Sequence, residues 1–79
     1  MNIETQVLEI LKENIEGHPN ISLHSDLRKN FSLDSFSTIM IINALEDDFN
    51  IVLEDAEFEF IHTASDIIKI LKEKYHVYN

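Results

Sequence analysis

The sequence predicts an all-α protein, a small bundle of three main helices and one short helix with a long first loop. Three observations support this fold class. The chain has 79 residues, which is enough for a single domain over residues 1–79 and leaves no room for a second module. Apolar residues recur at offsets of three and four, which is the spacing of an amphipathic helix. A single glycine and a single proline exclude collagen-like, glycine-loop and turn-rich β architectures.

The first helix is predicted over about residues 3–15, and a long loop follows over residues 17–33. The apolar residues of the helix lie on one stripe: Ile3, Val7, Leu8, Ile10, Leu11 and Ile15. Gly17 and Pro19 then end the helix. A loop of this length inside a small domain usually has a function, and its scattered apolar residues suggest that it packs back onto the helices.

Three further helical segments are predicted after the loop. The second main helix covers about residues 34–49, because an aspartate at its start is a suitable N-cap and no glycine or proline interrupts it. Residues 54–60 are expected to form a short helix. The last helix covers about residues 63–75, where Thr63 can cap the first turn and Asp66 can reciprocate in a variant of the capping box.

The charge of the chain excludes several classes of function. The formal net charge is −9, and residues 30–68 contain nine acidic residues and no lysine or arginine. Such a surface repels nucleic acid and anionic membranes, and a basic protein partner complements it. No apolar run is long enough to cross a membrane, and the amphipathic N-terminus lacks the basic region of a signal peptide. We therefore expect a cytoplasmic protein, and a monomer.

The sequence predicts no metal site and no catalytic residue. The absence of cysteine excludes a disulfide scaffold and a zinc-thiolate site. The four histidines, His18, His24, His62 and His76, lack the spacing of metal ligands. An EF-hand is rejected because residues 47–51 have no glycine and place apolar residues at ligand positions. No Gly-x-Ser-x-Gly motif surrounds any serine, so a serine hydrolase is not predicted.

The predicted second helix is apolar on two opposite sides. On a helical wheel one side carries Phe36, Ile39, Met40, Asn43 and Asp47. The opposite side carries Thr38, Ile41, Ile42, Leu45 and Phe49. A helix of this kind is normally buried all round, which so short a chain cannot provide. Either the long loop covers the first side, or that side is a docking surface, which the acids at the far end of the helix favour.

Ser35 follows the predicted N-cap, Asp34, at the start of this helix. A serine at such a position is most often only a solvated residue of the first turn. A phosphodiester attached to its hydroxyl would, however, be stabilised by the free N–H groups and by the helix dipole. The local sequence leaves both interpretations open.

Four motifs in fixed order extend this observation over residues 25–71. They are Leu33-Asp34-Ser35-Phe36, the Ala-Leu-Glu-Asp-Asp-Phe of residues 44–49, the Ile-Val-Leu-Glu-Asp of residues 51–55 and the Ile-His-Thr-Ala-Ser-Asp of residues 61–66. In this order and register, without a gap, the stretch resembles the acyl carrier protein family. Residues 1–16 match the first helix of that family in length and amphipathicity only.

The resemblance implies an acyl-carrier-like bundle with a 4′-phosphopantetheine arm on Ser35. A separate phosphopantetheinyl transferase would place the arm from coenzyme A. The thiol of the arm would carry acyl or aminoacyl groups as thioesters for fatty acid or polyketide biosynthesis, and the carrier itself would not be an enzyme. Loading and downstream enzymes with basic patches would bind at the second helix, and the residues expected there are Phe36, Ile39, Met40, Asn43, Glu46 and Asp47.

The chain also departs from the pattern of fatty-acid-synthesis carriers. Phe36 replaces a leucine or methionine, Ser32 stands where a glycine is common, and Ser37 and Met40 fall where acids are frequent. Phe58 replaces an alanine near the place where the acyl chain of the family enters the core. These departures point to a dedicated free-standing carrier with less room for a long chain. The alternative function is an acidic helical interaction or regulatory module without a prosthetic group.

Overall fold

The computed structural model describes residues 2–31 and 33–78, and over these residues it consists of helices and loops without a strand. The elements are α1 (Ile3–Asn14), α2 (Leu27–Asn30), α3 (Ser35–Phe49), the 3₁₀ helix η1 (Asp55–Phe60) and α4 (Ala64–Glu73). The predicted all-α bundle with three main helices is thereby confirmed. No helix among the described residues combines the length and the apolar character that a membrane span needs.

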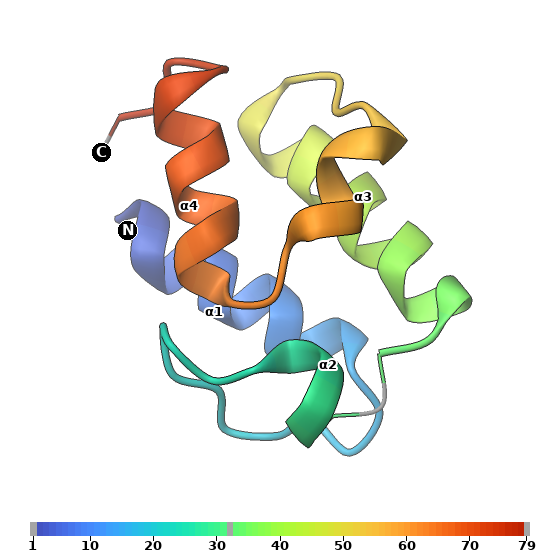
Figure 1. Ribbon diagram of the computed structural model, residues 1–79. Coiled ribbons are helices and arrows are strands. Elements are labelled where there is room, and N and C mark those ends of the chain that lie inside the picture. Colours follow the sequence, from blue (N-terminus) through green and yellow to red (C-terminus); the bar gives the residue numbers. More distant parts are fainter. Residues whose placement is uncertain (1, 32, 79) are drawn as a thin grey trace.

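The core lies between the three main helices. Helix α1 contacts both α3 and α4, and in Figure 1 η1 lies between α3 and α4 on the side facing the viewer. The largest fully buried side chains come from the four α-helices and from the residue after α1: Ile3, Val7, Leu11, Ile15, Leu27, Ile41, Leu45 and Leu71. Because each main helix buries only one stripe, their packing leaves the other side of α3 outside the core.

The ends of the main helices differ by one or two residues from the predicted ends. Ile15 is buried but has extended backbone, so α1 stops one residue earlier than its apolar stripe. Helix α4 begins with the predicted capping box, in which the Asp66 N–H donates to Thr63 Oγ1 and the Thr63 N–H donates to Asp66 Oδ2, both at 3.1 Å. It ends at Glu73, before His76, whose left-handed backbone (φ 56°) turns the chain away.

The long first loop predicted over residues 17–33 is present, and it contains the one-turn helix α2, which was not predicted. The carboxylate of Asp26 caps α2 by accepting hydrogen bonds from the N–H groups of Arg28 at 2.9 Å and Lys29 at 3.0 Å. Leu27 fills the core beneath it, and the Leu27 N–H donates to the His62 carbonyl at 2.7 Å. One turn is too short to show helical periodicity in the sequence. The expected packing of this segment onto the helices is confirmed, since its apolar side chains contact the core.

Candidate functional site

Ser35 is the first residue of α3, and its side chain is exposed. Asp34 is the N-cap of the helix: the Ser37 N–H donates to Asp34 Oδ1 at 2.7 Å, and the Thr38 hydroxyl donates to the Asp34 carbonyl at 2.8 Å. These bonds fix the turn that presents Ser35. The exposed hydroxyl therefore sits on a rigid helix start rather than on a loose loop.

The carboxylate of Asp34 is held in its ionised form. The hydrogen bond from the Ser37 N–H, together with the nearby Ser37 hydroxyl, keeps the pKa of Asp34 below its usual value. A negative charge at this position also interacts favourably with the positive end of the helix dipole. The cap consequently persists throughout the neutral pH range, and Ser35 keeps its place beside it.

An open hollow of about 330 Å³ lies next to Ser35. Its α3 wall is formed by Ser35, Thr38, Ile39 and Ile42, and Arg28, Leu33, Asp55 and Phe58 form the rest of its lining together with Asp34. The hollow joins the start of α3 to α2 and η1, so residues distant in sequence meet at the serine. Its lining combines apolar side chains with three charged ones, so the hollow could contact a bound group that has both polar and apolar parts.

The side of α3 that the sequence left ambiguous is exposed. Phe36 is 71% exposed, Ile39 55% and Met40 39%, and Asn43 and Asp47 are exposed as well. These five residues are called the α3 face below. The opposite side is in the core, with Ile41, Ile42 and Leu45 buried. The segment between α1 and α3 leaves the α3 face exposed, so the interpretation in which the long loop covers these apolar side chains is wrong.

Glu46, the sixth residue expected to bind partners, is not part of the α3 face. It is half-buried, and its Oε2 accepts a hydrogen bond at 2.9 Å from the N–H of Leu53, beyond the end of α3. The carboxylate thus fixes the turn between α3 and η1. The sequence showed only that Glu46 lies near the end of the helix. The backbone N–H of Leu53, seven residues later, leaves no signal in a helical wheel, so this hydrogen bond could not be predicted.

Three departures from the fatty-acid carrier pattern take different places in the structure. Ser37 is buried beside the Asp34 cap, and its N–H donates to the Asp34 carboxylate. Phe58 is buried, with 8% of its surface exposed, in the wall between the hollow and the core. Ser32 lies outside the described residues.

Arg28 is a residue of the site that sequence reasoning missed. It extends from α2 to η1, where Nε donates to the Ile61 carbonyl and Nη2 to the Phe58 carbonyl, both at 2.6 Å. Its only sequence signal is that it is the single arginine of the chain and, with Lys29, directly precedes the stretch of residues 30–68 that has no lysine or arginine. Elsewhere in residues 2–31 and 33–78, no three acidic or histidine side chains are grouped in a way that could hold a metal ion.

Comparison with known proteins identifies the family. The family model described as "Phosphopantetheine attachment site" matches residues 5–71. The chain is 32% identical to the acyl carrier protein of Rickettsia massiliae over 73 residues, which are 91% of this chain and 85% of that protein. It is 31% identical to the acyl carrier protein of Rickettsia bellii over 74 residues, 91% of this chain and 90% of that one. The chain therefore belongs to the acyl carrier protein family: it is a carrier rather than an enzyme, and its prosthetic group is covalently attached 4′-phosphopantetheine.

Proposed function

We propose that this carrier holds acyl or aminoacyl groups as thioesters on an arm attached at Ser35 and presents them to partner enzymes. The observation that carries the proposal is the exposed Ser35 hydroxyl at the capped start of α3, beside an open hollow. When bound, the prosthetic group supplies a thiol, which the chain itself lacks because it has no cysteine.

The start of α3 suits a phosphodiester on Ser35. The first N–H groups of a helix have no partner within the helix, and the dipole favours negative charge there. Asp34 uses the N–H of Ser37, so donors of the first turn remain for a phosphate. Attachment replaces the Ser35 Oγ–H bond by an Oγ–P bond. The adenosine bisphosphate half of coenzyme A leaves, and the proton passes to a base of the transferase or to water.

The α3 face is the proposed contact for the phosphopantetheinyl transferase and for the biosynthetic enzymes that load and use the cargo. Its centre is apolar, with Phe36, Ile39 and Met40, and its far end carries Asp47. An apolar centre next to charge is a common interface design. The acidic residues would steer partners that present basic patches. We expect the carrier to act in the cytoplasm as a monomer, which sedimentation of the purified protein would test.

The experiment is conversion of the purified protein with a broad-specificity phosphopantetheinyl transferase, Mg²⁺ and either coenzyme A or an acyl-coenzyme A. Intact-mass measurement should show one added arm in the first case and one acylated arm in the second. Hydroxylamine should then release the acyl group and leave the arm, because it cleaves thioesters and not phosphodiesters. An unchanged mass with several transferases, or an acyl group that resists hydroxylamine, would contradict the proposal.

A further inference from the structure

Two spaces in the molecule share a wall. The first is the open hollow of about 330 Å³ beside Ser35. The second is a small cavity of about 10 Å³ in the core, lined by Leu11, Leu27, Ile41, Ile61 and Ile67 among others. A cavity needs roughly 10–15 Å³ of this kind to hold a single water. The core therefore has no space for an alkyl chain, although it lies directly behind the hollow.

The wall consists of the four side chains that line both spaces: Arg28, Leu33, Thr38 and Phe58. Phe58 is buried between the two, and the Thr38 hydroxyl is tied to the Asp34 carbonyl at 2.8 Å. A chain that passed from the hollow to the core would have to displace at least one of these four side chains. The free-energy cost of moving these side chains thus decides whether an acyl chain remains in the hollow or enters the core.

Arg28 ties this wall together. Besides the bonds of Nε to Ile61 and of Nη2 to Phe58 at 2.6 Å, Nη2 lies 3.4 Å from the Glu59 carbonyl. All three carbonyls belong to the end of η1 or follow it, and a donor with a full charge makes such bonds shorter and stronger than neutral ones. Opening the wall at Arg28 would take the charged donor away from the Ile61 and Phe58 carbonyls, whose bonds to Arg28 are partly buried, and the loss of such a donor is costly.

We propose that Arg28 latches η1 to α2 and confines the cargo to the open hollow, so that this carrier serves short or polar acyl and aminoacyl groups and does not enclose a long chain. The inference rests on the proposed function, since it concerns the group held at Ser35. The composition of the hollow agrees with it: Ile39 and Ile42 offer an apolar wall, while Asp34, Asp55 and Arg28 offer charged ones. A long alkyl chain would extend beyond these walls into water.

The test compares the wild-type protein carrying acetyl, octanoyl and dodecanoyl groups, each loaded from the corresponding acyl-coenzyme A and verified by intact mass. The melting temperature and the rate of cleavage by hydroxylamine are measured for each form. The latch predicts the same melting temperature and the same cleavage rate for all three, because every thioester remains in solvent. A melting temperature that rises with chain length, with cleavage slowed several-fold, would overturn the proposal, because it would show that the chain enters the core.

Two variants locate the effect at the latch. Arg28→Met removes the three bonds and keeps a long side chain, and Lys29→Met is the matched control, since it removes the same charge from an exposed neighbour in α2. With octanoyl cargo, Arg28→Met should melt higher than its acetyl form and resist hydroxylamine several-fold better, whereas Lys29→Met should behave as wild type. Equal behaviour of the two variants would count against the latch.

If Arg28→Met does not fold, Phe58→Ala opens the same wall, and the wild-type series is decisive by itself. Failure of loading would instead refute attachment, which the mass measurement shows separately.

Discussion

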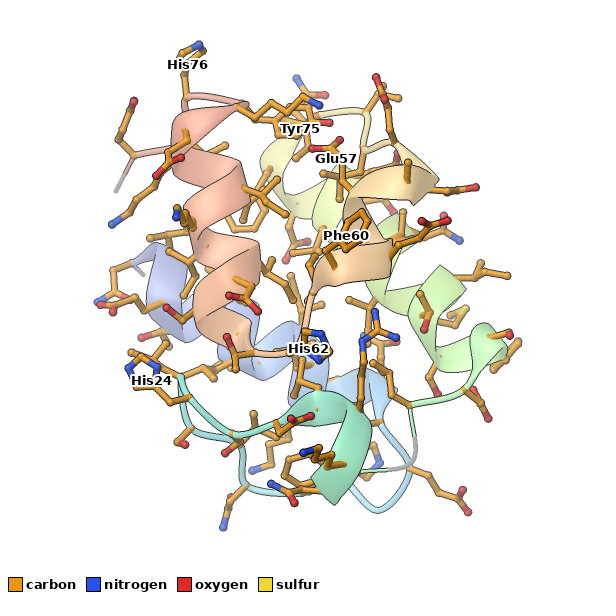
Figure 2. All side chains as sticks on the ribbon, in the orientation of Figure 1. His24, Glu57, Phe60, His62, Tyr75 and His76 are labelled. Carbon is orange, nitrogen blue, oxygen red and sulfur yellow. The ribbon has the colours of Figure 1, made fainter. Side chains whose placement is uncertain are left out.

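Tyr75, just after the end of α4, donates its hydroxyl hydrogen bond to the carboxylate of Glu57 in η1, so two segments eighteen residues apart are joined at one end of the bundle (Figure 2). Lys74 Nζ lies 3.4 Å from the other carboxylate oxygen, and the Glu54 N–H donates to Glu57 at 3.1 Å. Burial alone would raise the pKa of Glu57, but these hydrogen bonds and the lysine outweigh it and lower the pKa below its ordinary value. Glu57 and Arg28 thus hold η1 at its two ends.

The first prediction concerns Glu57 at acid pH. Because its folded pKa is lower than the ordinary value of 4.5, its contribution to stability is present above that value and is lost as the pH falls through the folded pKa. Glu57→Gln should therefore lower the melting temperature at neutral pH and flatten its decline below pH 4.5. Glu59→Gln, an exposed change in the same helix, is the control. Parallel acid profiles for both variants and wild type would refute the role of Glu57.

The second prediction concerns Tyr75 at alkaline pH. Burial, with the hydrogen bond to Glu57, raises the pKa of Tyr75 from 10.0 to about 12. A raised pKa means that the contribution to stability is fully present below 10.0 and is lost as the pH rises through about 12. Ultraviolet titration of Tyr75→Phe should lose the late-titrating phenol, whereas Tyr78→Phe, which alters an exposed tyrosine, should retain it. A late phenol that survives in Tyr75→Phe would be evidence against this assignment.

The third prediction concerns ionic strength. Nine acidic residues and no lysine or arginine lie between residues 30 and 68, and they repel one another in the folded protein. Added salt screens this repulsion, so the melting temperature of the unmodified protein should rise between low and moderate sodium chloride concentrations. A flat or falling response would mean that the acidic surface does not limit stability.

The fourth prediction separates the two sides of α3. Met40 is partly exposed, so Met40→Ala should change stability little and weaken transferase binding by about 1–2 kcal/mol. Leu45 is fully buried on the other side, so Leu45→Ala should lower the free energy of unfolding by about 2–5 kcal/mol. Urea midpoints and modification rates of both variants provide the comparison. A large loss of stability in Met40→Ala with an unchanged modification rate would move the partner surface elsewhere.

The main helices and their caps could be predicted from the sequence, because periodicity and capping residues act over a few neighbouring positions. Asp34 and Thr63 cap α3 and α4 where their residue types indicate. Contacts between distant positions could not be predicted in this way. Arg28 bonds to carbonyls thirty or more residues later, and Glu46 bonds to a backbone group beyond its own helix. Backbone groups carry no side-chain identity, so their partners leave no pattern in the sequence.

The exposed side of α3 shows the same limit. The helical wheel placed apolar residues on both sides, and only the packing of the folded protein, which buries Ile41 and Leu45 and exposes Phe36, shows which side the other helices cover. Whether the α3 face is covered depends on where the segment between α1 and α3 lies. That segment contains α2, a helix too short to be recognised from its periodicity. The position of Ser35 at a helix start could be predicted from the sequence, because it depends on a local cap. The hollow beside it could not, because residues of α2 and η1 form part of its lining.

The most direct test of the account is the mass of Ser35→Ala after incubation with coenzyme A and a phosphopantetheinyl transferase. Ser65→Ala is the matched control, because it removes a hydroxyl from the first turn of another helix, α4, and leaves Ser35 and the Asp34 cap in place. We predict that wild type and Ser65→Ala each gain the mass of one arm, that Ser35→Ala gains none, and that Ser35→Ala melts close to wild type. An arm on Ser35→Ala, or an unmodified wild type, would contradict it.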